Sequence, residues 1–106
     1  MAYEMVPEVA KLVERIVELA HPLRILLFGS FARNTQNFDS DVDLLVVMPE
    51  GTHRRKTAQR LYGDVRGAGI PFDILVATPG DLEKHKNNIG LIYHTVLKEG
   101  VEVYAA

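Results

Sequence analysis

The sequence contains no cysteine and no long apolar run. Without cysteine, the chain cannot form disulfide bonds, thiolate metal sites or a cysteine nucleophile. No apolar stretch approaches the roughly 20 residues that a membrane-spanning helix needs, and the first residues do not show the basic and then apolar pattern of a secretory signal. We therefore expect a cytoplasmic protein without a membrane partner.

An excess of charge of one sign is also missing. The 106 residues include 12 basic and 14 acidic side chains, which gives a net charge of −2. This balance gives no reason to expect direct binding to nucleic acid. Because 47% of the residues are hydrophobic, the chain can bury one small core but not a second one. We expect a single domain over residues 1–106, and any domain that selects a large substrate would lie on another protein.

Hydrophobic periodicity predicts helices that alternate with short strands. Helices are predicted over residues 4–20, 53–68 and 79–87, and from 89 to a stop at Gly100. Apolar runs predict strands at 24–28, 42–48 and 71–78, with an edge strand at 101–104. The buried faces of the second and last helices are expected to hold Ala58, Leu61, Tyr62 and Val65, and Ile89, Ile92, Tyr93, Val96 and Leu97. The pattern is typical of an α/β (α+β) fold with a small mixed β-sheet and helices packed on it.

The lengths of the connections predict how the strands pair. Residues 31–40 are too few for the helical crossover, about a dozen residues or more, that joins parallel strands. The first two strands should therefore be antiparallel. The second and third strands are separated by a full helix, which suits a parallel crossover. This topology brings the end of the first strand and the beginnings of the next two to the same edge of the sheet.

Three acids and a glycine–serine pair fall at that edge. Gly29-Ser30 ends the first strand, Asp41-Val42-Asp43 begins the second, and Asp73 lies at the start of the third. Since alternate residues of a strand share a face, Asp41 and Asp43 should point the same way. Converging carboxylates repel one another and raise each other's pKa unless a cation compensates them.

The same pattern predicts a metal site for phosphoryl chemistry, to which Asp39 could add a further acid of the same parity. Oxygen ligands favour Mg²⁺ or Mn²⁺ over zinc, and two such ions about 4 Å apart can hold the attacking and leaving oxygens of a displacement at phosphorus. We expect Asp41 and Asp43 to bridge the metals and a triphosphate, and Asp73 to hold the metal that activates an acceptor hydroxyl. The alternatives are a solvated acidic turn for Asp41 and Asp43, and an edge carboxylate bound by backbone amides for Asp73.

The residues around the glycine suit a phosphate. Gly29 lets the backbone approach a ligand, and Ser30 can cap a short helix over 31–33 whose free amides would face phosphates. Arg33 either reaches a phosphate or is solvated. We expect the basic cluster His53, Arg54, Arg55, Lys56 and Arg60 to be the solvated face of a helix, with contact to an acidic partner as the alternative. The tyrosines are expected to be core or rim residues, namely Tyr3, Tyr62, Tyr93 and Tyr104, and we assign no role to His85 and His94.

The combination of Gly29-Ser30, ten residues, Asp41-x-Asp43 and Asp73 in Phe72-Asp73-Ile74-Leu75-Val76 resembles the minimal nucleotidyltransferase (MNT) domain of the DNA polymerase β superfamily. The resemblance covers nearly the whole chain, although Asn34 stands where the family often has glycine. It implies that Gly29 and Ser30 grip a nucleoside triphosphate such as ATP. It also implies that Asp41, Asp43 and Asp73 are the ligands of two Mg²⁺ ions.

Minimal members of this family resemble the antitoxins of HEPN/MNT toxin–antitoxin pairs. The resemblance implies that the chain transfers AMP from ATP to a hydroxyl group, which belongs to a tyrosine of a HEPN toxin partner. Two alternatives stay open, namely a nucleotidyltransferase for a small molecule of the aminoglycoside type, and an antitoxin that masks its partner without catalysis. The sequence leaves the possibility of a homo-oligomer open as well.

Overall fold

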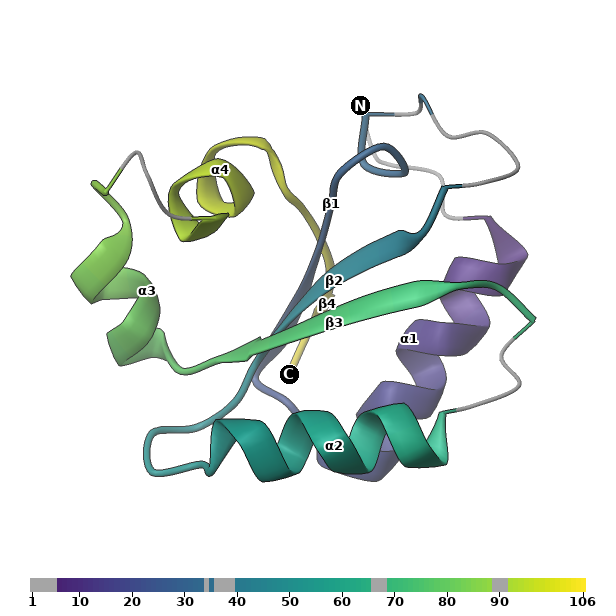
Figure 1. The fold of residues 1–106 in the computed structure, drawn as a ribbon, viewed down its shortest axis with the longest axis horizontal. Coiled ribbons are helices and arrows are strands. Elements are labelled where there is room, and N and C mark those ends of the chain that lie inside the picture. The colour runs from purple at the N-terminus through teal and green to yellow at the C-terminus, as the bar shows by residue number, and fades with distance from the viewer. Residues whose placement is uncertain (1–5, 34, 36–39, 66–68, 89–91) are drawn as a thin grey trace.

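The computed structural model describes residues 6–33, 35, 40–65, 69–88 and 92–106. Helices and strands alternate along this part of the chain (Figure 1). The elements are α1 (Pro7–Ala20), β1 (Arg24–Phe28), β2 (Val42–Val47), α2 (Arg54–Asp64), β3 (Phe72–Ala77), α3 (Pro79–His85), α4 (Ile92–Glu99) and β4 (Val101–Ala105). None of the helices in these ranges has the length and apolarity needed to span a membrane.

In the described part of the chain the strands form one mixed sheet in the order β3-β2-β1-β4. Strand β1 is antiparallel to both β2 and β4, whereas β2 and β3 are parallel. Both pairings inferred from the connection lengths are confirmed, and β4 is an edge strand as predicted. The start of β2 consequently lies beside the start of β3 and the end of β1.

The two faces of the sheet are covered by different helices, with α1 and α2 on one side and α3 and α4 on the other (Figure 1). Leu44 and Val46 of β2 belong to the core shared with α1 and α2, while Leu45 and Val47 belong to the core shared with α3 and α4. All four side chains are at most 1% exposed. Burial on both faces explains why β2 is a continuous apolar run, and each such side chain contributes about 1.5–3 kcal/mol to stability.

Several helices differ from their predicted limits or faces, since α1 begins at Pro7 rather than at residue 4 and α3 ends at His85 rather than at residue 87. Helix α2 ends at Asp64, and the predicted continuation over 66–68 lies outside the described residues. In α4 the predicted buried stripe is only partly buried, because Val96 is inaccessible while Ile92 is 48% and Leu97 37% exposed. Helix α4 packs on β1 and α3, so its flanks face solvent and the prediction was wrong for these two side chains.

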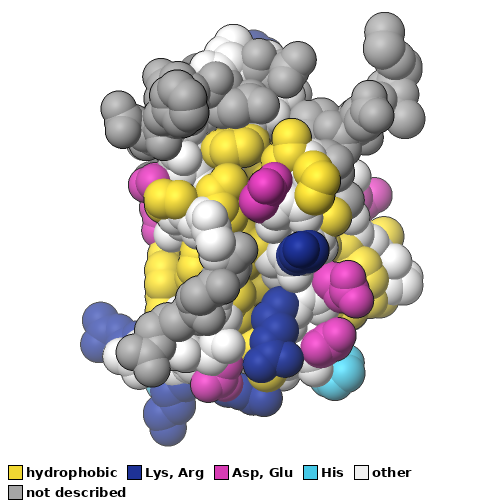
Figure 2. Space-filling view, turned by 90° about the vertical axis from the view of Figure 1, so that its right-hand side faces the viewer, with side chains coloured by type: hydrophobic (Ala, Val, Ile, Leu, Met, Phe, Trp, Pro, Cys, Tyr) yellow, Lys and Arg dark blue, Asp and Glu magenta, His cyan; other side chains and the backbone are white. Residues whose placement is uncertain are grey.

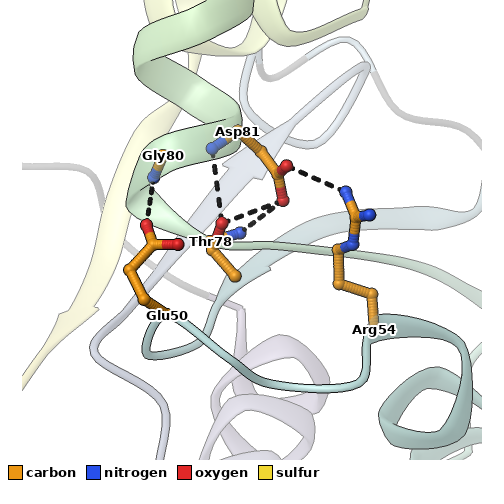
Figure 3. A network of polar contacts seen from close by, with 5 residues as sticks. All are labelled: Glu50, Arg54, Thr78, Gly80 and Asp81. Carbon is orange, nitrogen blue, oxygen red and sulfur yellow. Dashed lines mark hydrogen bonds and ion pairs between the residues drawn. The ribbon is translucent and has the colours of Figure 1, made fainter.

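Helix α3 is attached to the rest of the fold at its first turn (Figure 3). Thr78 and Asp81 form a capping box, in which the Asp81 N–H donates to Thr78 Oγ1 at 3.3 Å and the Thr78 N–H donates to Asp81 Oδ2 at 2.9 Å. Arg54 of α2 pairs with Asp81 Oδ1 at 2.8 Å, and the Gly80 N–H donates to the Glu50 carboxylate. The bond from the Thr78 backbone, followed by the Thr78 side chain and Arg54, holds the pKa of Asp81 below its usual value, although burial acts to raise it. The network connects three elements at the end of β3 away from Asp73.

The side of the molecule that faces right in Figure 1 carries hydrophobic side chains near its middle (Figure 2). Acidic and basic side chains both border this group in the view. Interspersed charges of both signs fit the nearly balanced composition of 12 basic and 14 acidic residues. The charge visible on this face therefore has no single dominant sign.

Candidate functional site

Asp43 and Asp73 lie next to each other on parallel strands. Asp43 is the second residue of β2 and is the register partner of Asp73, the second residue of β3. Both have the parity of Leu45 and Leu75, which pack with α3 and α4, so the two carboxylates are on that face of the sheet. The topology predicted from the sequence thus brings these two acids together.

Asp41 lies close enough to influence Asp43 but does not belong to the strand. Strand β2 begins at Val42, so Asp41 precedes it and is exposed. The pKa of Asp43 is raised above its usual value, first by burial and then by the negative charges of Asp73 and Asp41, while Arg33 lowers it. These four charged side chains therefore share one electrostatic environment. Asp39 lies outside the described residues.

The turn after β1 places backbone directly against Asp43. Gly29 has a φ of 75°, in the left-handed region that glycine adopts without strain. A Cβ atom at this position would lie 2.3 Å from Oδ2 and 3.2 Å from Cγ of Asp43. The backbone conformation therefore favours glycine, and a larger residue would force the Asp43 carboxylate to shift.

The segment after Gly29 is a turn rather than the predicted short helix. The Arg33 N–H donates to the Gly29 carbonyl at 3.2 Å, and the Thr35 N–H donates to the Ser30 carbonyl at 2.9 Å. Residues 31–33 close one helical turn but do not continue it. Ser30 is half-buried and Arg33 is exposed at this turn.

Tyr62 is a member of the site that the sequence interpretation missed. It was expected on the buried face of α2, but it is 37% exposed. Its hydroxyl donates to Asp73 Oδ1 at 2.5 Å and accepts from the Ile74 N–H at 2.8 Å. Its ring stacks on Phe72 with centroids 5.6 Å apart. Burial, followed by the bond to Asp73, raises the pKa of Tyr62 above its usual value of 10.0, so the hydroxyl keeps its proton at neutral pH.

The donor chemistry of this site fits a hard divalent cation, but its geometry offers a pair of acids. Carboxylate oxygens without His or Cys are the ligands that Mg²⁺ and Mn²⁺ prefer. Among the described residues, no group of three or more His, Cys, Asp or Glu side chains is arranged to hold a metal ion. The predicted convergence therefore holds for Asp43 and Asp73, whereas Asp41, which precedes β2 and is exposed, is not arranged with them as a third ligand.

Other polar side chains singled out in the sequence have structural contacts. His53 caps α2 by accepting the Lys56 N–H at 3.2 Å. Arg60 donates to the Leu19 carbonyl at 3.0 Å. The His94 ring lies 3.0 Å from the Lys86 carbonyl, and His85 stacks on Tyr93. These contacts explain the residues without a role in chemistry.

Comparison with known families and solved structures shows what the chain is similar to. The family described as "Nucleotidyltransferase domain" matches residues 9–103. A search of curated proteins found no match. One similar structure is a provisionally assigned nucleotidyltransferase from Sulfolobus solfataricus, which is 21% identical with a TM-score of 0.61 over 92% of this chain and 78% of that one. Another is a toxin–antitoxin structure with AMP-PNP, which is 20% identical with a TM-score of 0.60 over 95% of this chain and 75% of that one. The two structures share the fold, and the match over residues 9–103 shows that this chain belongs to the nucleotidyltransferase domain family.

Proposed function

We propose that this chain transfers AMP from ATP to the hydroxyl of a tyrosine on a partner protein, a HEPN toxin. By this transfer it acts as an antitoxin. The observation that carries the proposal is the side-by-side register of Asp43 and Asp73, with Gly29 against Asp43, in a chain of the nucleotidyltransferase family. The similar fold of a toxin–antitoxin structure with AMP-PNP supports the nucleotide and the kind of partner.

The residues divide between the nucleotide and the acceptor. The turn with Gly29, Ser30 and Arg33 would bind the triphosphate, because a backbone without a Cβ can approach phosphate oxygens and a guanidinium pairs with them. Asp43 is the acid against that turn, and Asp41 precedes it by two residues in the chain. Asp73 lies farther from the turn, on the edge strand β3, and would receive the acceptor's proton.

Two Mg²⁺ ions held by Asp41, Asp43 and Asp73 would neutralise the triphosphate and lower the pKa of the acceptor hydroxyl. In the reaction the acceptor oxygen bonds to the α-phosphorus, and the bond from that phosphorus to the bridging oxygen breaks. Pyrophosphate leaves with the electron pair, and Asp73 accepts the hydroxyl proton. Asp41 and Asp73 are both exposed, so an acceptor on a second protein can reach this edge.

The test uses the purified chain, the protein encoded beside it in the genome, Mg²⁺ and ATP. Mass spectrometry should find AMP on the partner, and the Asp43→Asn variant should slow the transfer by roughly 100-fold or more, because it keeps the shape but removes a charge from the site. Asp64→Asn makes the same chemical change at the exposed end of α2 and should leave the rate unchanged. If Asp43→Asn rescued cells from the toxin as well as the native chain did, and no adduct formed, the proposal would fail in favour of masking.

A further inference from the structure

The Tyr62 hydroxyl joins two layers of the fold at the free edge of the sheet. Tyr62 belongs to α2, which covers the face opposite to Asp73. Strand β3 is an edge strand, and the Ile74 N–H is bound by Tyr62 at 2.8 Å. The phenol thus satisfies a backbone donor at the open edge and reaches Asp73 Oδ1 at 2.5 Å from the same atom.

We propose that Tyr62 is a positioning residue for Asp73, and that its hydroxyl fixes the carboxylate in the orientation that the transfer reaction needs. The catalytic consequence rests on the proposed function, since it assigns Asp73 to the acceptor side of that reaction. The contact itself rests on the geometry of three neighbouring residues, Tyr62, Asp73 and Ile74.

An exposed carboxylate on an edge strand needs such a support. Asp73 is exposed, and solvent alone would leave its side chain free to change rotamer. The single proton of the phenol is directed at Oδ1, which leaves Oδ2 for a cation or for the acceptor proton. Misplacement of a reacting group by about 1 Å can cost on the order of 100-fold in rate, so a fixed carboxylate is worth more than a mobile one.

The ring of Tyr62 is itself held in place. It stacks on Phe72 with an interplanar angle of 14°, and Phe72 directly precedes Asp73 in β3. The hydroxyl accepts one bond and donates another. The Ile74 N–H occupies the phenol oxygen and the stacked ring holds it there, which favours a support for Asp73 over an acceptor of AMP, because an acceptor oxygen must be free to bond to phosphorus.

A double-mutant cycle in urea tests the contact without any need for transfer activity. The four forms are the native chain, Tyr62→Phe, Asp73→Ala and the double variant. Tyr62→Phe removes the bond to the Ile74 N–H in both backgrounds, so that loss of unfolding free energy cancels. The difference between the two losses therefore reports the Tyr62–Asp73 interaction. We expect Tyr62→Phe to lower the unfolding midpoint clearly in the native background and by less in the Asp73→Ala background. Equal shifts in the two backgrounds would overturn the proposal.

The kinetic arm separates positioning from general packing. Tyr62→Phe should lower kcat for AMP transfer about 10- to 100-fold, the usual cost of losing a residue that orients a reactive group. The KM for ATP should stay unchanged, because Asp73 is on the acceptor side. Tyr104→Phe deletes the same atom on β4, at the other edge of the sheet, and should change neither constant.

The outcomes distinguish this proposal from the proposed function. If no form of the chain transfers AMP but the urea cycle shows coupling, the reaction assignment fails while the positioning of Asp73 by Tyr62 stands. If the native chain transfers AMP and Tyr62→Phe transfers it equally fast, the positioning role is overturned. An AMP adduct on Tyr62 itself would also overturn it, because the phenol would then be an acceptor.

Discussion

The Oδ2 atom of Asp43 lies beside Gly29, only 2.3 Å from the point at which any other residue would carry its Cβ. Asp43 comes from β2, and Gly29 follows the last residue of β1, Phe28, which is the register partner of Asp43. The glycine turn and the acid are therefore positioned by one pair of antiparallel strands. A change in either residue should be felt by the other.

Replacing Gly29 by alanine should reduce the free energy of unfolding by about 2–4 kcal/mol. The estimate combines the strain of a left-handed backbone at a residue with a Cβ and the overlap with a neighbouring group. Equilibrium unfolding in urea measures the loss.

Gly51→Ala is the matched control for this change. Gly51 has a φ of 89°, but a Cβ there would meet nothing within 4 Å. This variant should lose only the free energy of unfolding that corresponds to backbone strain, about 1–2 kcal/mol. Similar losses for the two variants would contradict the contact between Gly29 and Asp43.

Asp43→Asn should stabilise the protein at neutral pH. The folded state raises the pKa of Asp43 through burial and the charges of Asp73 and Asp41, so the ionised carboxylate is less favourable in the folded than in the unfolded chain. This penalty is fully present above the raised pKa and disappears as the pH falls below the ordinary value of 3.8. Thermal melts should therefore show a gain in Tm at about pH 7 that shrinks toward acid pH. A gain that is constant with pH would contradict this explanation.

Asp81→Asn should destabilise the protein at neutral pH, whereas Asp43→Asn should stabilise it. The bonds from Thr78 and the charge of Arg54 lower the pKa of Asp81 in the folded state, so its ionised form stabilises the fold above the usual pKa and this contribution is lost as the pH falls through the lowered value. The variant should melt at a lower temperature than the native chain at about pH 7, and the difference should narrow in acid. At about pH 7 the same Asp-to-Asn change should thus raise the Tm at position 43 and lower it at position 81.

The features that were predictable from the sequence are those set by local periodicity and connection length. The apolar runs located the strands, and the short link before β2 determined that Asp43 would meet the end of β1. Tyr62 was not predictable in this way, because its spacing on α2 is that of a core residue, and the packing of α2 on the edge strand β3 brings its hydroxyl to Asp73.

The position of Asp41 shows a second limit of sequence reasoning. Its parity with Asp43 predicts a shared face only if the strand extends to residue 41, and β2 begins at Val42. Similarly, the apolar spacing in α4 predicts burial of Leu97, but a short helix that packs on β1 and α3 leaves that side chain 37% exposed. Element ends and the extent of cover depend on tertiary packing.

A nucleotide and a divalent cation should together stabilise the chain if the site works as proposed. Mg²⁺ compensates the repulsion of Asp41, Asp43 and Asp73, and a non-hydrolysable ATP analogue adds contacts with the turn at Gly29. A ligand at 100 times its Kd raises the free energy of unfolding by about 2.7 kcal/mol. For a chain of this size the shift in Tm should be on the order of 10 °C. Differential scanning fluorimetry or calorimetry measures it.

The controls for this shift isolate the acids of the site. The Asp41→Asn/Asp43→Asn double variant should show no combined shift, although its Tm without ligand should exceed that of the native chain because the like charges are gone. Asp64→Asn changes an acid at the exposed end of α2 and should keep the full shift. Mg²⁺ alone should give a smaller effect than the two ligands together, because a carboxylate pair with a third acid apart binds a cation weakly until phosphate oxygens complete its coordination. An unchanged Tm of the native chain at millimolar concentrations of both ligands would contradict a metal–nucleotide site at Asp43.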